Sequence, residues 1–434
     1  MNRKTRSAAF LTGLACAGGL ACAQLLPGGL GVVPDRLVGN VLQPLSGTGT
    51  AVGAIASRLE ASPLLQSFEP ASLRDLRRER LRLLVRERRA VLEMDDAGNP
   101  VRRGEILAID PAPDLVVRAQ AAGFVLLERE ALEGLDQTLL LLGAPRGKDI
   151  DSALKTLRAL DPAGHFAPNH VYEPAGGALA AIAAQPAAGD GAAAMSIGMI
   201  DGGVAAHPAL ARASIEQRGF APGAPRASGH GTAVASLLVG EDGRFAGAAA
   251  GARLLVADVY GGDPASGSAQ RIARAVGWLA TRGARVITIS LVGPPNPLIE
   301  HAVRAARRRG ILVVAAVGND GPAAPPQYPA SYPDVVAVTG VDAKGRALPE
   351  AGRASHLDFA APGAGLAAAL PGKGYAEVRG TSFATPLVAA RLAYLDDVTL
   401  ARARAEAEPG RGRVGNGILC RRCAVPPKMV MTKK

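Results

Sequence analysis

The sequence predicts two folding units, a small α+β unit followed by a larger α/β unit built on a parallel sheet. Two observations support this prediction. Between residues 104 and 173, strands and helices follow one another in the order βαββαβ, and from residue 195 onward Val- and Ile-rich strands alternate with helices. A chain of 434 residues with 48% hydrophobic positions is long enough to bury a core in both units.

The first 23 residues have the composition of a secretory signal peptide. A basic start is followed by an apolar run and by Ala21-Cys22-Ala23, whose small residues are typical of a cleavage site. We therefore expect an exported protein, periplasmic or extracellular, with no membrane attachment after cleavage. An uncleaved anchor is the alternative, although the apolar run is short for a spanning helix.

Residues 24–103 are predicted to be loosely ordered apart from one Arg-rich helix over residues 72–92. Ser72 is a plausible N-cap, and Gly98-Asn99-Pro100 is a stop signal. The arginines could contact an anionic surface. Acidic residues lie between them, so a solvated helix face is the better explanation.

The small unit has predicted strands over residues 105–109, 124–128, 138–142 and 165–172, and helices over 113–122 and 149–160. Two split βαβ units of this size predict a ferredoxin-like sheet backed by two helices. Residues 173–194 are rich in Ala, Gly and Pro, which indicates a connection between folded units.

The large unit has predicted strands over residues 196–200, 254–259, 286–289, 311–317 and 335–338, and helices over 269–281 and 297–309. Buried strands separated by helices predict a parallel sheet covered on both faces. Active sites in such sheets gather beyond the carboxyl ends of the strands.

Four polar residues stand at strand ends or helix starts of this unit. Asp201 follows the first strand, and Asn319 follows the fourth. His230 lies between two glycines at the start of a helix, and Ser382 lies in the motif GTSFATP, residues 380–386. Each alone fits an ordinary turn, loop or cap residue. Together they supply the carboxylate, base, amide donor and nucleophile that amide hydrolysis needs.

In these motifs, residues 195–398 resemble the subtilisin-like serine peptidases, or subtilases. The resemblance implies that Ser382 is the nucleophile of a serine endopeptidase, His230 its general base and Asp201 the orienting carboxylate. Asn319 and the Ser382 N–H would form the oxyanion hole.

The resemblance also implies where a protein or peptide substrate would bind. Ser290, Leu291, Val292 and Gly293 would pair with the extended substrate, while Ala316 and Gly318 would form the opposite wall of the specificity pocket. Many members have a glycine where this chain has Val292. The branched side chain should narrow the pocket and favour small or medium residues before the scissile bond.

The chain departs from the family pattern at three further places. Gly202 lacks the hydroxyl that usually follows the catalytic aspartate, and Ala233 replaces a usual histidine. Residues 237–246 have no counterpart of the family's calcium loop. We therefore expect no metal at that site and no cofactor.

Subtilase propeptides are small ferredoxin-like domains that assist folding and then inhibit the enzyme. The resemblance therefore implies a zymogen in which residues 104–173 are a propeptide and act as an intramolecular inhibitor. A tail at about residues 171–177 would lie in the active-site cleft. The catalytic domain would span residues 174–400, followed by a C-terminal tail, 401–434. We expect a monomer.

Other classes of function are less consistent with the sequence. A catalytically silent relative, kept as a binding or chaperone module, would be favoured by loss of a triad residue, and none is lost.

The net charge of +11 suggests nucleic-acid binding, but the arginines are scattered and aromatic residues make up only 3%. After signal cleavage only Cys420 and Cys423 remain, a pair that suits a disulfide or free thiols better than zinc.

Overall fold

The computed structural model describes residues 70–175, 177–182, 195–243, 245–372, 374–421 and 423. All of them belong to one compact unit, residues 48–434. The expected signal peptide, residues 24–69, most of the expected connection after Ile182 and the chain end after Cys423 lie outside the described residues.

A sheet of seven parallel strands forms the centre of the large unit, in the order β15-β14-β13-β11-β8-β10-β9. The strands are β8 (Ser196–Asp201), β9 (Ser214–Gly219), β10 (Arg253–Asp258), β11 (Val286–Ile289), β13 (Leu312–Ala316), β14 (Val335–Val341) and β15 (Phe359–Pro362). The five inner strands were predicted from their apolar runs. The two outer strands were missed, because β9 is largely polar and β15 has only four residues.

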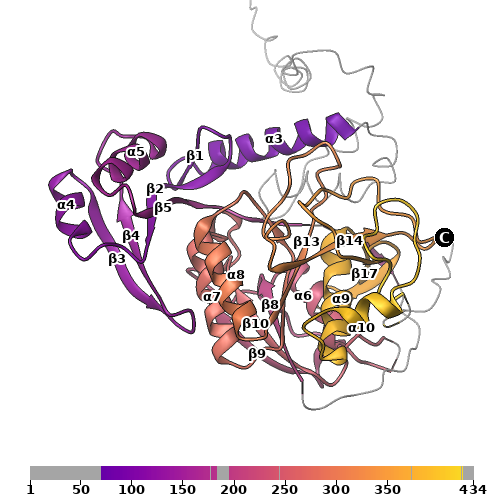
Figure 1. Ribbon diagram of the computed structural model, residues 1–434. Helices are drawn as coiled ribbons and strands as arrows, with labels where there is room; N and C mark the ends of the chain where they lie inside the picture. Colours follow the sequence, from indigo (N-terminus) through magenta and orange to yellow (C-terminus); the bar gives the residue numbers. More distant parts are fainter. Residues whose placement is uncertain are drawn as a thin grey trace, which may run out of the picture. The chain divides into compact units, whose positions relative to one another are not determined.

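Two pairs of helices cover the two faces of this sheet (Figure 1). On β8, Ile197 and Met199 pack in the core shared with α6 (Gly229–Val239) and α9 (Thr381–Leu395). Ile200 packs in the core shared with α7 (Ala269–Thr281) and α8 (Pro297–Arg308). This alternation confirms the predicted three-layer α/β fold. Two short 3-10 helices, η2 (Pro208–Leu210) and η3 (Pro264–Ser266), lie in its loops.

The small unit is an antiparallel sheet in the order β5-β2-β4-β3, with helices α4 and α5. Its elements are β2 (Pro100–Ile109), α4 (Leu115–Ala121), β3 (Val125–Leu132), β4 (Gln137–Gly143), α5 (Ile150–Leu160) and β5 (His165–His170), which is the predicted βαββαβ order. Ile106 and Leu142 pack in the core of this unit with α4 and α5. Leu107 and Leu141 point the other way and pack with α7 and α8.

The N-terminal helix differs from its prediction. Helix α3 (Pro70–Glu87) begins before Ser72, with a proline in the first turn, where its missing N–H costs least. It ends before the predicted limit, and β1 (Leu92–Met94) then pairs with the start of β2. Gly98, at φ +79°, belongs to the turn between these strands and is not a helix stop. Residues 70–103 are therefore structured, and the small sheet begins before residue 104.

The expected connection after residue 173 and the expected C-terminal tail both contribute to the large unit. β6 (Glu173–Pro174) pairs with β12 (Leu291–Val292), and β7 (Gly177–Ile182) extends the sheet of β16 (Leu366–Ala369) and β17 (Tyr375–Arg379). Beyond residue 400, α10 (Ala401–Glu406) is followed by buried Ile418 and Leu419, so the packed domain does not end there. Cys420 and Cys423 form a disulfide, one of the two expected states.

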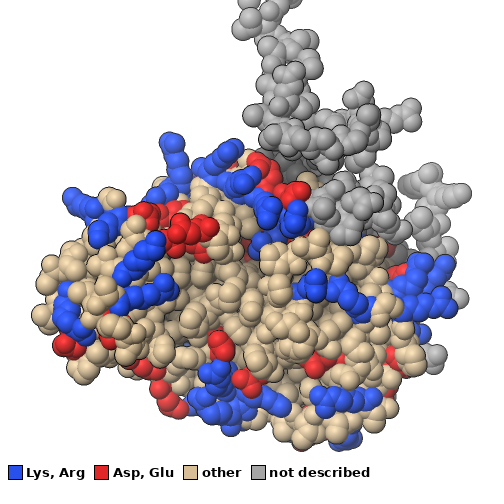
Figure 2. Space-filling model, turned by 45° about the horizontal axis from the view of Figure 1, so that its top comes forward, with Lys and Arg blue, Asp and Glu red and all other residues tan. Residues whose placement is uncertain are grey.

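The surface carries basic side chains in separate groups. Figure 2 shows them on one face of the molecule with acidic side chains between them. Among the helices of the described part of the chain, none is both long and apolar enough to cross a membrane.

A glycine in α7 allows the small unit to approach the large one, which leads to a first prediction. A Cβ at Gly277 would lie 2.0 Å from the Glu133 carbonyl oxygen in the β3–β4 hairpin. Gly277→Ala should displace this hairpin while improving the helix itself by about 1 kcal/mol. In a chain that also carries Ser382→Ala, at the residue expected to be the nucleophile, hydrogen exchange should become faster in the hairpin. The large sheet is the internal control, and unchanged exchange in the hairpin would contradict this account.

Candidate active site

The carboxylate of Asp201 lies against the imidazole of His230. Asp201 is the last residue of β8, and His230 is the second residue of α6. The His230 Nδ1 atom is 3.0 Å and 2.8 Å from the two Asp201 carboxylate oxygens, and the side chains are 11% and 1% exposed. A carboxylate at Nδ1 favours the tautomer with its proton there, which leaves Nε2 able to accept one. The imidazole therefore has the orientation of a general base.

The packing around Gly202 explains why this position lacks the hydroxyl side chain that usually follows the aspartate in the family. Its backbone N–H donates to Asp201 Oδ1 at 2.7 Å, so the carboxylate still has a local donor. A Cβ at Gly202 would lie 2.4 Å from Ser228 Oγ. Ser228 is the N-cap of α6 and accepts from the Gly231 N–H, and it therefore positions the turn that carries His230. Ala233, which stands where the family usually has a histidine, is fully buried in the core.

Ser382 lies in the first turn of α9 and is fully buried. Its carbonyl accepts from Ser290 Oγ at 2.9 Å, which ties the helix start to β12. The ring of the next residue, Phe383, packs on the His230 ring with centroids 5.3 Å apart. Within the described residues, Ser382 Oγ has no hydrogen-bond partner. A hydroxyl held at a helix N-terminus without a competing partner is suited to nucleophilic attack.

The side-chain amide of Asn319 is held in one orientation. Its Oδ1 accepts from the Thr381 N–H at 3.0 Å, and its Nδ2 donates to the carbonyl oxygen of Ala175. Gly380, at φ +133°, allows this approach, because a Cβ there would lie 2.8 Å from Asn319 Nδ2. The amide donor therefore points at a peptide carbonyl, while the amide oxygen is bound at the start of α9.

A segment of the chain itself occupies the expected substrate position. β6 pairs antiparallel with β12, with Glu173 opposite Val292, and the Ala175 N–H donates to the Ser290 carbonyl at 2.9 Å. On its other side, the Tyr172 N–H donates to the Gly267 carbonyl at 2.7 Å. The segment thus lies between two chain edges. The sequence predicted only the edge at β12, since the residues around Gly267 form a loop without a strand pattern.

The Ala175 side chain lies in a small apolar space between predicted pocket residues. It clusters with Val292 and Ala316. A Cβ at Gly318 would lie 3.3 Å from Val292 Cγ1, so the walls are close together. The other predicted residue of this edge, Gly293, lies against Tyr172.

Two buried tyrosines fix the segment further upstream. The Tyr172 hydroxyl donates to the Pro294 carbonyl at 2.5 Å, and the Tyr260 hydroxyl donates to the Tyr172 carbonyl at 3.0 Å. Burial, and then the negative charge of Asp201, raises the pKa of Tyr260 well above its usual value. Tyr260 therefore stays protonated and remains a donor. Nothing in the sequence had marked either tyrosine.

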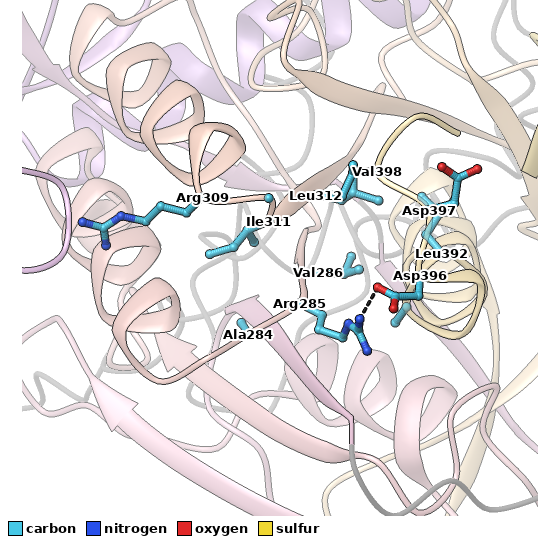
Figure 3. Close-up of a pocket in the computed structure, with 12 residues that line it drawn as sticks. Ala284, Arg285, Val286, Arg309, Ile311, Leu312, Leu392, Asp396, Asp397 and Val398 are labelled. Atoms are coloured by element: carbon cyan, nitrogen blue, oxygen red, sulfur yellow. Dashed lines mark ion pairs between the residues drawn. The ribbon is translucent and has the colours of Figure 1, made fainter. Parts of the chain in front are cut away.

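A cavity of about 240 Å³ lies at the amino ends of strands of the large sheet, opposite the carboxyl ends that carry the candidate active site (Figure 3). It is lined by the residues before and at the starts of β11 and β13 and by the end of α9, and Arg285 pairs there with Asp396. It is remote from the carboxyl ends of the strands, so it is not part of the candidate active site. Within the described ranges, no group of three or more His, Cys, Asp or Glu side chains could hold a metal ion.

Comparison with known proteins identifies the family. The model of the subtilase family matches residues 192–402. Subtilisin Savinase from Lederbergia lenta is 36% identical over 204 residues, which are 45% of this chain and 73% of that protein. This chain belongs to the subtilase family of serine endopeptidases.

Two further relatives show how far the similarity extends. An alkaline protease from Alkalihalobacillus alcalophilus is 36% identical over 204 residues, 45% of this chain, and the chain spans about half of its length (52%). Fervidolysin from Fervidobacterium pennivorans, described as a keratinolytic enzyme related to subtilisin, has a TM-score of 0.61 at 18% identity. That match covers 78% of this chain and 63% of fervidolysin, and it concerns the fold alone.

The Asn319 geometry leads to a second prediction for this subtilase. In subtilisin, removal of the corresponding type of donor is known to cost on the order of a hundredfold to a thousandfold in turnover. We expect a loss of that size for Asn319→Ala in kcat on a peptide substrate. Asn416→Ala, an exposed asparagine whose amide bonds to the Asp358 carbonyl, is the control. An equal loss in both variants would contradict the role of Asn319.

The contact between Gly202 and Ser228 leads to a third prediction. Gly202→Ser should push Ser228 away and shift His230, and a misplacement of about 1 Å costs on the order of a hundredfold in rate. The double variant G202S/S228G should recover most of the loss, since Ser→Gly at an N-cap costs only about a few tenths of a kcal/mol. Peptide hydrolysis by both variants, with S228G alone as control, measures this. Absence of recovery would refute the steric explanation.

Proposed function

We propose that this subtilase is an exported zymogen that cleaves its own chain between Ala175 and Gly176 and then hydrolyses other proteins or peptides. The observation that carries the proposal is the hydrogen bond from Asn319 Nδ2 to the Ala175 carbonyl, on a segment paired with β12 like a substrate. β6 and β7 lie on either side of this bond, and each is paired with a strand of the catalytic unit.

The proposed step assigns one role to each residue. Ser382 Oγ attacks the Ala175 carbonyl carbon while His230 Nε2 takes the hydroxyl proton. Asn319 Nδ2 and the Ser382 N–H stabilise the oxyanion. His230 then gives its proton to the nitrogen of Gly176, the bond to that nitrogen breaks, and an acyl-enzyme forms. Water activated by the same imidazole releases Ala175, while Asp201 holds the ring in place throughout.

The small unit is then proposed to remain bound as an inhibitor. Its apolar face is buried against α7 and α8. Charged contacts surround this face: Arg274 Nε on α7 lies 2.7 Å and 2.8 Å from the Glu130 carboxylate oxygens, and Arg274 also pairs with Glu128. These contacts do not involve the cut bond and would survive the cleavage. A chaperone role for residues 104–173 follows from the same buried surface, which the catalytic unit made alone would expose.

Substrate class and location are part of the same proposal. The space around Ala175, closed by Val292 and Ala316, supports a preference for small residues before the cut. Pairing of the segment Tyr172 to Ala175 with Ser290 on one side and Gly267 on the other supports an extended peptide as substrate. Export rests on the composition of residues 1–23. The proposed reaction needs no group from a second chain, and we propose a monomer.

The cleavage site is a fourth prediction. The mature protein should begin at Gly176, as measured by intact-mass and N-terminal mass spectrometry of the secreted form. The Ser382→Ala chain should stay uncut, because it lacks the nucleophile. A mature wild-type protein starting elsewhere would refute the site, and self-cleavage by the Ser382→Ala chain would refute the mechanism. No processing and no hydrolysis in the wild type would favour the catalytically silent alternative.

The pocket around Ala175 yields a fifth prediction. Ala175→Phe overfills the space beside Val292, and such a misfit costs about 1 to 3 kcal/mol. Self-cleavage should then slow roughly tenfold to two-hundredfold, as followed by gel electrophoresis over time. Ala175→Gly removes one methyl group and should be cut nearly as fast as the wild type. Equal rates for the two variants would contradict a narrow pocket.

A further inference from the structure

We propose that helix α3, which lies outside the ferredoxin-like unit, is a second inhibitory element that clamps the cleaved tail in the cleft. This inference rests on the proposed function, since it concerns how the tail ending at Ala175 is retained. The clamp consists of Arg77, Arg80 and Leu84 on α3. Its targets are the tail residues Val171 and Glu173, and Asp320 of the catalytic unit.

The charged part of the clamp joins α3, the tail and the oxyanion-hole loop. Arg80 Nη2 donates to Glu173 Oε2 at 3.2 Å and to Asp320 Oδ1 at 3.3 Å. Arg77 Nε lies 3.0 Å from Asp320 Oδ2. Asp320 directly follows Asn319 in the sequence. One arginine therefore holds the residue two positions before Ala175 and, at the same time, the neighbour of the oxyanion donor.

The charged groups are largely withdrawn from water. The exposed fractions of the side chains are 12% for Arg77, 21% for Arg80, 15% for Glu173 and 7% for Asp320. Ion pairs with this little exposure are screened by solvent less than surface pairs. Removal of one partner leaves a buried carboxylate unpaired, which is the costly case. These contacts therefore oppose separation of α3 from the catalytic unit.

Apolar contacts flank the ion pairs along the same helix. Near its start, Leu73 is buried against Gly321, where a Cβ would lie 3.0 Å from the leucine Cδ1 atom. Near its end, Leu84 clusters with Val171 of the tail and Ala265 of the catalytic unit. The tail from Val171 to Glu173 is thus held by α3 as well as by its pairing with the cleft. Because these contacts with α3 do not depend on the strand pairing, cutting the bond after Ala175 leaves them intact.

The predicted solvated face of this helix holds for Arg78, Arg82 and Arg86, which are exposed, but not for Arg77 and Arg80. Arg78 and Arg82 are each 61% exposed, and their ion pairs are with Asp75 and Glu79 of the same helix. They match Arg77 and Arg80 in residue type and helix. The pair Arg78→Ala/Arg82→Ala is therefore a control for lost charge and changed helix propensity.

The test uses the full chain with Ser382 intact and compares R77A/R80A with R78A/R82A. Self-cleavage is followed by gel, and activity by hydrolysis of a short peptide with Ala before the cut. The lag before activity is counted from the completion of self-cleavage in each variant, so that a change in the rate of cutting does not enter it. The lag between cleavage and activity should shorten at least about tenfold in R77A/R80A alone, because loss of a buried charge pair speeds dissociation. Equal lags in the two variants would overturn the clamp.

A second measurement keeps the clamp testable if the chain does not cut itself, an outcome that would count against the proposed function instead. In the Ser382→Ala background, hydrogen exchange at the Tyr172 and Ala175 amides should be faster in R77A/R80A than in R78A/R82A. Glu173→Gln, which removes the negative charge opposite Arg80 and leaves α3 intact, should raise the exchange rate to a smaller extent. Unchanged exchange in both R77A/R80A and Glu173→Gln would overturn the clamp.

Discussion

The amide of Asn319 is the contact on which the arrangement of the site depends. Its Oδ1 atom accepts from the Thr381 N–H at the start of α9, and its Nδ2 atom donates to the Ala175 carbonyl. It thereby joins the loop after β13, the helix that carries Ser382, and the end of the tail. A side-chain amide with both of its polar atoms engaged cannot rotate freely, so the donor is preorganised before any charge develops.

In the proposed zymogen, the tail would inhibit by occupying the cleft, without displacing the proposed catalytic groups. The Asp201 carboxylate contacts His230, and Asn319 donates to the Ala175 carbonyl, while the tail is present. The groups that would bind a substrate also bind the tail. A change in these groups that weakens binding of the tail would therefore weaken binding of the substrate as well. Contacts outside the cleft escape this constraint. The faces of α7 and α3 are such places, and most of the interfacial ion pairs lie there.

The departures from the family pattern become understandable as packing constraints. Gly202 leaves space for Ser228, which caps the helix of His230, and its N–H supplies a donor to the carboxylate. Ala233 fills a fully buried position in the core behind that helix. Neither change removes a group that the proposed reaction uses.

The sequence by itself determined the features that depend on local pattern: the βαββαβ order, the inner strands of the large sheet, and the polar residues at strand ends and helix starts. The tertiary structure decided the rest. The second edge beside the tail, at Gly267, lies in a loop without periodicity, and Tyr260 reaches the tail from an unrelated segment. Arg80 and Asp320 are 240 positions apart, and an arginine on a helix has the same local pattern whether it meets water or a distant carboxylate. Only the folded chain brings such groups together.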